Sequence, residues 1–409
     1  SMVSEGETIE KAEEGREVEL FLDRTPFYAE SGGQIGDSGT IVTPTGTVKV
    51  RDTQFAVPGL HGHRGAVTEG VVQLGQDAEL TISHVRRERI RKNHTGTHIL
   101  HWALREIVGD HVHQAGSLVS DDRLRFDFSH YHGMSVEELR EVELAANERV
   151  IENAAVLTLE TSKADAEKMG ALAFFGDKYG DQVRVVQTGD YSTEFCGGTH
   201  VPTTGQIGPL IVVSEGSVAA NTRRIDAVTG TAGYEYLSHL RRDLEQTESA
   251  LGAQPGHVVE AAQALVLRAK EQEERIEQFE QQSRSEAARG LLDQVEEHGS
   301  HRVLVAKQEG LTGDALRALA FQIRDRLGSG IGVLGSTSGG KGALIAFVSE
   351  DLVVGGISAG EIIGPAARVL GGGGSRDASL SQAGGPHGDR LDDALEVALI
   401  AAREAVERL

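Results

Sequence analysis

The first part of the chain alternates between short apolar runs and turn residues. Val18–Leu22 and Gly39–Val42 are rich in strand-favouring side chains, and turns such as Gly32-Gly33 and Val57-Pro58-Gly59 separate runs of this kind. Closely spaced short strands favour a small barrel or a sandwich. We therefore predict a small β-barrel over residues 1–80.

The next part, residues 81–230, combines a helical period with strand-like runs. A helical pattern begins near Ser83 and continues to Leu104. A second helix is predicted over Ser135–Asn153, because Ser135 stands three residues before Glu138, as in a capping box. Strand-like runs follow at Val183–Gln187 and Leu210–Val213. Helices mixed with such strands indicate an α+β domain.

The remaining residues change character twice. Over residues 231–299, leucines at heptad-like spacing are interrupted by Gln254-Pro255-Gly256, which predicts a helical hairpin or a short coiled coil. Residues 300–409 have an α/β pattern, with predicted strands at Val303–Ala306 and Ala343–Val348 and predicted helices at Asp314–Leu327 and Leu391–Leu409. The expected class is therefore α+β: a small β-barrel, an α+β domain, a helical hairpin linker and a C-terminal α/β domain.

Composition limits the classes of protein that the chain can belong to. Its 409 residues include one cysteine, so an intramolecular disulfide is excluded. No run approaches the ~18–20 apolar residues of a membrane-spanning helix, and no signal peptide is evident, so we expect no membrane contact. With 40 Lys and Arg against 62 Asp and Glu, the net charge is −22. Any nucleic acid must therefore be met by a local basic surface.

Two short motifs carry metal-binding chemistry. His94 and His98 are four residues apart, so a helix would present both imidazoles on one face, close enough to share a zinc ion. Cys196 and His200 are separated by Gly197-Gly198 and a threonine, and the glycines let the backbone bend so that sulfur and imidazole converge. Together the four side chains would form a zinc site. The alternatives are a chance histidine pair, and a buried structural cysteine beside an exposed histidine.

A basic cluster leads directly into the histidine pair. Such a cluster would favour phosphate beside a metal centre, although most charge runs form a solvated helix face. A second basic pair precedes a strand-like run. The candidate residues for contact with phosphate or nucleic acid are Arg86, Arg87, Arg89, Arg91, Lys92, Arg223 and Arg224.

Glycine-rich segments are the last candidates. Glu30–Gly39 is either a tight connection between strands or a functional turn, since its Gly-Gly-Gln tripeptide, ending at Gln34, also occurs in peptide-chain release factors. Gly371–Gly374 is either a flexible loop or a place where the backbone approaches phosphates closely. Gly339–Gly342 lacks the Walker spacing, so we assign no ATP site to it.

In order and spacing, these motifs resemble the alanyl-tRNA synthetases. The segments that carry the resemblance are Glu30–Gly39, His94–His101, His111–Ser117, Leu124–Phe128, Cys196–His200, Arg223–Gly230, Gly371–Gly374 and Gln382–Gly385. The class II aminoacylation motifs and their ATP site are not found. We therefore expect the editing and C-terminal portion of such an enzyme, opening on a vector-like Ser1-Met2. A free-standing relative of the editing domain is the alternative.

The resemblance implies roles for particular residues. The residues that match the zinc ligands of the family are His94, His98, Cys196 and His200. Gln114 matches the glutamine of the editing pocket, and Thr95 and Thr97 lie in the pocket-forming motif. Thr97 and Gln114 are the catalytic candidates, because a hydroxyl and an amide can position a water or bind the side-chain hydroxyl of a serine substrate. Gly96 replaces the alanine usual between these threonines, which we expect to loosen the pocket.

The reaction implied by the resemblance is an aminoacyl-tRNA deacylation, the hydrolysis of the ester that joins misplaced serine or glycine to the 3′ adenosine of tRNA(Ala). One Zn²⁺ ion is the implied cofactor, whereas ATP and Mg²⁺ would serve only the aminoacylation half. The implied partners are mischarged tRNA(Ala) and a second copy of the chain, in a homodimer through the C-terminal region. The implied location is the cytoplasm.

Two other classes of function stay open. One is a tRNA-binding or dimerisation module in which zinc is only structural. The other is a release-factor-like hydrolase that acts through Gln34.

Overall fold

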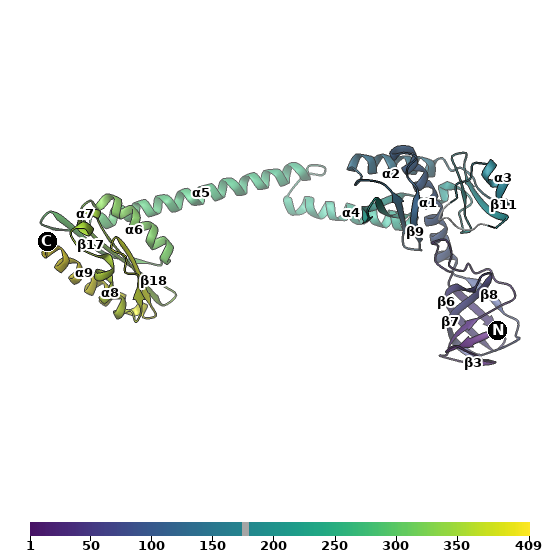
Figure 1. Cartoon of the computed structure of the whole chain (residues 1–409), viewed down its shortest axis with the longest axis horizontal. Coiled ribbons are helices and arrows are strands. Elements are labelled where there is room, and N and C mark those ends of the chain that lie inside the picture. The colour runs from purple at the N-terminus through teal and green to yellow at the C-terminus, as the bar shows by residue number, and fades with distance from the viewer. Residues whose placement is uncertain (174–179) are drawn as a thin grey trace. The chain divides into compact units, whose positions relative to one another are not determined.

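The computed structural model describes residues 1–173 and 180–409, and the chain divides into two compact units, Ser1–Ser249 and Ala250–Leu409 (Figure 1). Each unit combines helices with β-sheet, so the mixed α+β class expected from the sequence is found. The finer division into four domains remains a prediction. Within the described ranges, no helix is both long enough and apolar enough to cross a membrane.

An antiparallel sheet forms the beginning of the first unit. Its centre is the hairpin of β6 (Gly46–Val57) and β7 (Leu60–Gln73), and the strands follow the order β2-β1-β4-β7-β6-β5-β8, with β3 also paired to β7. The other strands are β1 (Met2–Ser4), β2 (Glu7–Thr8), β3 (Lys11–Glu13), β4 (Glu17–Leu20), β5 (Gly39–Thr43) and β8 (Glu79–Ile82). Within the described residues β2 and β8 end this order without pairing with each other, so closure of the predicted barrel is not confirmed.

The long helix α1 (His84–Val108) follows this sheet and confirms the helix predicted from Ser83. Its buried side contacts a second antiparallel sheet, of order β14-β15-β10-β9, and Ile99, Leu100 and Leu104 lie in their common core. The strands of this sheet are β9 (Gln114–Val119), β10 (Leu124–Ser129), β14 (Leu210–Ala219) and β15 (Thr222–Thr229).

Helix α2 (Val136–Ile151) packs against α1 and begins at the predicted capping box. The Glu138 amide donates to Ser135 Oγ at 3.1 Å, and the Ser135 amide donates to the Glu138 carboxylate at 2.7 Å. These two bonds satisfy backbone donors that have no partner inside the helix.

A third, small sheet carries the segment that precedes the only cysteine. Its strands are β11 (Val156–Ser162), β12 (Gln182–Thr188) and β13 (Ser192–Phe195), joined in that order. The helical segments that accompany it are α3 (Lys163–Lys168) and the 3₁₀ turn η1 (Thr204–Ile207). Since β13 ends at Phe195, the sheet fixes where the chain turns away at Cys196.

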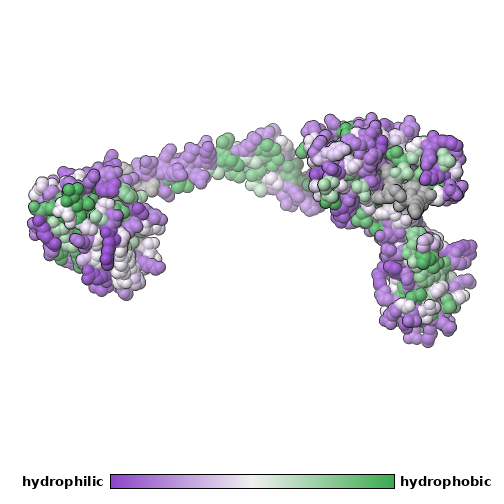
Figure 2. All heavy atoms as spheres, in the orientation of Figure 1, coloured by the Kyte–Doolittle hydropathy of each residue, from purple (hydrophilic) through white to green (hydrophobic). Residues whose placement is uncertain are grey.

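Two helices flank the predicted break. They are α4 (Gly230–Leu251) and α5 (Val258–Leu292), and Gly252 and Gly256 between them have the positive φ angles that glycine tolerates. Apolar side chains are exposed along both helices, as Figure 2 shows for α5; they include Leu237, Leu240, Leu244, Val259, Leu265 and Val266. Packing of the two helices as a hairpin stays a prediction.

The second unit is built on a sheet of order β16-β17-β18-β19-β21-β20, in which β17 and β18 are parallel and the other pairs antiparallel. Its strands are β16 (Glu296–His298), β17 (His301–Glu309), β18 (Gly330–Ser338), β19 (Lys341–Val348), β20 (Gly373–Gly374) and β21 (Leu380–Gly385). Its other helices are α6 (Gly313–Leu327), α7 (Glu350–Val354), α8 (Ala359–Val369), the 3₁₀ turn η2 (Gly388–Arg390) and α9 (Leu391–Glu407). The strands predicted at 303–306 and 343–348 and the helices predicted at 314–327 and 391–409 are confirmed.

Alternation along these strands produces a core on each face of the sheet. Ile331 and Val333 pack with α8 and α9, whereas Leu334 and Phe347 pack with α6 and the end of α5. Because neighbouring side chains of a strand point to opposite faces, one sheet separates the two helical layers.

Replacing the capping serine should destabilise the first unit. We expect Ser135→Ala to lower the free energy of unfolding by about 1 kcal/mol, because the Glu138 amide loses its acceptor. Glu138→Gln is the matched control, since glutamine still accepts from the Ser135 amide. Chemical denaturation followed by circular dichroism measures both variants. Equal loss in the two variants would contradict a capping role for Ser135.

Candidate metal centre

Four side chains from two distant segments converge in the first unit. His94 and His98 lie one turn apart on α1, and Cys196 and His200 lie in the loop after β13. Their potential donor atoms all lie within 4.8 Å of one another. Cys196 Sγ is 3.3 Å from Nε2 of His94 and 3.3 Å from Nε2 of His200. The structure therefore brings together the set of residues predicted as zinc ligands.

The loop that carries Cys196 is held in a tight bend. Both carbonyl oxygens of Cys196 and Gly198 accept hydrogen bonds from Arg184 Nη1 at 2.7 Å. A Cβ atom at Gly198 would overlap the ring of His94, so a glycine is needed for the loop to pass this close to the histidine. The motif predicts that its glycines let the backbone bend, and at Gly198 the reason is steric, because a larger residue would collide with His94.

In each imidazole of the cluster, the nitrogen that faces away from the other donors lies close to an oxygen atom. Nδ1 of His200 lies 3.1 Å from Oγ1 of Thr95. The single hydroxyl proton of Thr95 is donated to the Arg91 carbonyl at 2.9 Å, so the hydroxyl can only accept from His200. Nδ1 of His94 lies 2.7 Å from Oε1 of Gln34. Partners of this kind orient metal-binding histidines and fix their tautomer.

The third imidazole, that of His98, shares a buried carboxylate with His101. Glu194 contacts Nδ1 of His98 and lies 3.0 Å from Nδ1 of His101. Burial would raise the pKa of Glu194, but the two histidines outweigh burial and lower this pKa to about 2. Burial would likewise lower the pKa of His98, yet Glu194 and Cys196 raise it to about 10. Without a metal, His98 and Glu194 therefore form a buried charged pair.

Cys196 and His200 have pKa values shifted toward the forms that bind zinc, a thiolate and a neutral imidazole. Burial raises the pKa of the Cys196 thiol, but the fields of His94, His200 and His98 outweigh it and hold this pKa well below its usual range. Burial lowers the pKa of His200 to about 3, despite the nearby Cys196. A thiolate and imidazole nitrogens are the donor set of zinc sites, so these residues fit a zinc ion.

A cavity of about 320 Å³ opens beside the cluster. Both catalytic candidates line it. Thr97 Oγ1 donates to the Asn93 carbonyl at 2.8 Å, and Gln114 Nε2 donates to Ser117 Oγ at 3.1 Å. Further lining residues, from several elements, are Tyr28, Ser31, His94, His98, Arg184 and Cys196. The cavity therefore joins the donor cluster to hydroxyl and amide groups.

Two other residues of the pocket-forming motif, Thr95 and Gly96, are not among the residues that line the cavity. Gly96 faces the core, where a Cβ atom would lie 3.0 Å from Thr229 Cγ2 and 3.4 Å from side-chain atoms of Leu124 and Leu210. The expectation that Gly96 loosens the pocket is therefore not supported, because the glycine allows α1 to pack closely on the sheet. Thr95 is fully buried behind His200 and does not line the cavity.

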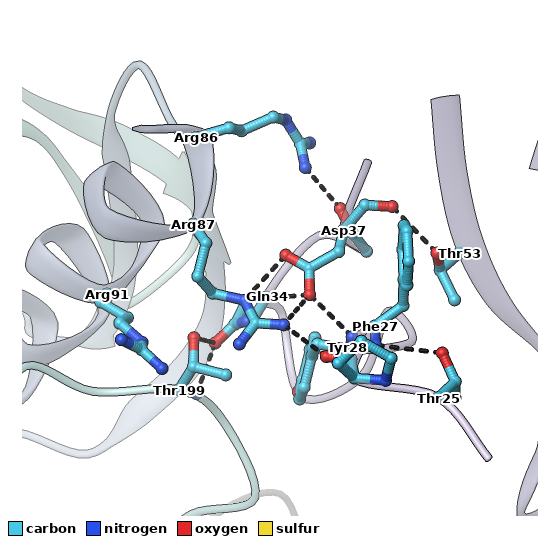
Figure 3. Close-up of polar contacts among 12 residues, drawn as sticks. Thr25, Phe27, Tyr28, Gln34, Asp37, Thr53, Arg86, Arg87, Arg91 and Thr199 are labelled. Carbon is cyan, nitrogen blue, oxygen red and sulfur yellow. Dashed lines mark hydrogen bonds and ion pairs between the residues drawn. The ribbon is translucent and has the colours of Figure 1, made fainter. Parts of the chain in front are cut away.

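Most of the predicted phosphate-binding arginines have partners inside the protein. Arg87 is buried and donates through Nε to both carboxylate oxygens of Asp37 at 2.9 Å (Figure 3). Arg86 donates to the Gly36 carbonyl at 2.6 Å and pairs with Asp121 at 3.3 Å. A phosphate would have to displace these partners, so the structure gives Arg86 and Arg87 a role in holding the N-terminal sheet.

The other members of the basic set differ in exposure. Arg91 is bonded to Glu88 at 2.7 Å, Arg223 to Glu215 at 2.8 Å and Arg224 to Asp127 at 2.7 Å. Arg89 is exposed, and Lys92 is half-buried. Contact of any of these residues with tRNA stays a prediction.

Sequence reasoning did not assign the residues that orient the donors. Arg184 lies in β12 and Glu194 in β13, and neither residue belongs to a recognisable sequence motif. Gln34 was marked by its tripeptide, but for a different chemistry. Gln34 contacts His94, 60 positions away, and Thr199, 165 positions away. Local spacing in the sequence cannot reveal contacts of this kind.

The chain is similar to three family models and to several known proteins. Three family models match: "tRNA synthetases class II (A)" over residues 1–86, "Threonyl and Alanyl tRNA synthetase second additional domain" over residues 183–226, and "DHHA1 domain" over residues 300–404. The alanine–tRNA ligase of Acetivibrio thermocellus is 42% identical over 398 residues, and that of Bacillus subtilis 41% over 394 residues. The solved C-Ala domain of Aquifex aeolicus alanyl-tRNA synthetase is 27% identical, with a TM-score of 0.25, and the match covers 27% of this chain and 97% of that one.

The matched models place the chain among the tRNA synthetases that carry a second additional domain. More narrowly, the chain belongs to the alanyl-tRNA synthetase family. The matches to the two ligases cover 97% and 96% of the chain but only 45% of each ligase. The chain thus spans about half the length of the curated relatives it matches.

The donor cluster predicts stoichiometric zinc binding. We expect the purified chain to hold one equivalent of zinc, and Cys196→Ala to lose it, because a thiolate donor is removed. His239→Ala is the control. His239 is exposed, and within the described residues its side chain bonds to Asp243 and lies in no metal-binding cluster. Elemental analysis after dialysis measures the metal content. Full retention of zinc by Cys196→Ala would rule out the cluster as the binding site.

Proposed function

We propose that this chain hydrolyses tRNA(Ala) mischarged with serine or glycine, as the editing portion of an alanyl-tRNA synthetase. The observation that carries the proposal is the position of the donor cluster in the wall of a cavity that Thr97 and Gln114 also line. A synthetase pocket for alanine cannot cheaply reject the similar side chains of serine and glycine, so a separate hydrolytic site is needed.

A zinc ion held by His94, His98, Cys196 and His200 would supply Lewis acidity toward the ester carbonyl or a water. The chain's own groups would orient the substrate. Thr97 donates its proton to the Asn93 carbonyl, so its oxygen is left to accept a hydrogen bond from the serine hydroxyl. Gln114 uses one amide hydrogen on Ser117 and keeps its carbonyl oxygen and second hydrogen for the substrate.

The tRNA would be bound mainly by groups that have no internal partner. Arg89 is exposed and forms no ion pair within the described residues, which favours it over Arg87 as a phosphate contact. For the longer protein, we propose the ATP- and Mg²⁺-dependent attachment of alanine to tRNA(Ala) in the cytoplasm, with a homodimer formed through the C-terminal region. A free-standing deacylase remains the alternative to a portion of that longer protein.

One observation favours a second candidate, a tRNA-binding module with structural zinc. All four donors lie close enough to bind one ion, and closed four-ligand shells are typical of structural zinc sites. The release-factor-like alternative has less support, because Gln34 is fully buried and its amide oxygen is engaged by His94 and Thr199.

Deacylation assays separate the two candidates. We expect the zinc-loaded chain to release serine and glycine from tRNA(Ala) and to leave alanine attached, as measured with radiolabelled amino acids. Cys196→Ala should abolish release, and His239→Ala should not change it. If the zinc-loaded chain binds tRNA(Ala) but leaves the seryl ester intact, the structural-zinc module is correct and the editing proposal is wrong.

Thr97 should act on serine but not on glycine. We expect Thr97→Val to slow the release of serine about 10-fold, the cost of about one lost hydrogen bond, and to leave glycine release unchanged because glycine has no hydroxyl. Thr97→Ser keeps the hydroxyl and should restore the rate with serine. Equal slowing with both substrates would show that Thr97 supports the helix and does not read the substrate.

A further inference from the structure

The glycine-rich segment Glu30–Gly39 forms part of the metal centre's surroundings without supplying a donor. Gly32 and Gly33 have φ angles of +56° and +83°, which strongly favour glycine. The carbonyl of Gly33 accepts from the Val119 amide of β9 at 2.7 Å, and a Cβ atom at Gly33 would lie 2.5 Å from Ser117 Oγ. The turn is therefore seated against the strand that carries Gln114.

This turn places Gln34 against the donor cluster. Oε1 of Gln34 lies 2.7 Å from Nδ1 of His94, and the Thr199 amide donates to the same atom at 2.8 Å. Because a backbone N–H can only donate, this atom of Gln34 is the oxygen and not the nitrogen. His94 must then carry its proton on Nδ1, which leaves the Nε2 lone pair directed toward Cys196, 3.3 Å away.

A buried ion pair fixes the same turn to α1. Asp37 accepts from the Tyr28 amide at 2.7 Å and from the Arg87 guanidinium, and Arg86 holds the carbonyl of Gly36 (Figure 3). Arg87 lies about two helical turns before His94, so the anchor and the histidine share one side of the helix. The position of Gln34 is therefore fixed by α1, the helix that also carries His94.

We infer that Gln34 is a positioning residue of the metal centre, which fixes the tautomer of His94 and ties the Cys196 loop to α1. His98 has its oxygen partner in Glu194 and His200 has its partner in Thr95, both within the part of the unit that supplies the donors. His94 takes its partner from the N-terminal sheet region. This inference deepens the proposed function, on which it rests, because the proposed editing site is the same metal centre.

The test measures zinc affinity of the whole chain by competition with a chromophoric chelator. We expect Gln34→Leu, which has no acceptor, to bind zinc about 10- to 100-fold more weakly. Gln34→Glu keeps an acceptor for His94 and Thr199 and should restore most of the affinity. Gln76→Leu is the matched control, because Gln76 also makes two side-chain hydrogen bonds in the N-terminal sheet region, away from the metal centre.

The visible spectrum of the cobalt-substituted chain is the second readout. It should change in Gln34→Leu, return toward wild type in Gln34→Glu and stay unchanged in Gln76→Leu. If Gln34→Leu does not fold, Gln34→Asn, whose amide is one methylene too short, takes its place. Wild-type affinity and spectrum in these variants, or an equal loss in Gln76→Leu, would overturn the inference. Because neither readout uses tRNA, a failure of deacylation in the wild type would overturn only the proposed function.

Discussion

A buried imidazole that offers one nitrogen to a metal has a proton on its other nitrogen, and burying that proton without an acceptor costs free energy; the candidate metal centre supplies an oxygen for each such nitrogen. The three acceptors come from separate places: Gln34 beside the N-terminal sheet, Thr95 on α1 and Glu194 on β13. The turn that carries Gln34, helix α1 and strand β13 must therefore be packed together for all three acceptors to reach the histidines. The fold of the unit and the chemistry of the site thus depend on the same few hydrogen bonds.

Charge inside this unit follows the same logic. Glu194 is an ionised carboxylate with almost no exposure, and it is tolerated there because His98 and His101 surround it. Asp37 is tolerated because Arg87 and the Tyr28 amide neutralise and solvate it. A net charge of −22 is therefore compatible with a low pKa of the Cys196 thiol, since the state of the thiol depends on its immediate neighbours and not on the charge of the whole chain.

Sequence patterns predicted the candidate donors and the helices, but not the residues that orient the donors. The pairs His94/His98 and Cys196/His200 are visible because each obeys a local spacing, and α2 because Ser135 and Glu138 form a cap within one turn. Partners of Arg87 and Gln34 lie 50 or more positions away, so a basic run looked like a phosphate site when two of its members hold the N-terminal sheet. Pairing of short strands is equally non-local, which is why barrel closure was expected and is not confirmed.

The anchoring of Gln34 also bears on how such a chain can be divided and inherited. Gln34 precedes β5 and the donors begin at His94, so a boundary drawn between them would separate a histidine from the oxygen that orients it. Gene fusion, recombination or truncation that treats the N-terminal sheet as an interchangeable module would leave the donors present but misoriented. In this chain the N-terminal sheet region and the metal centre are therefore joined through Gln34.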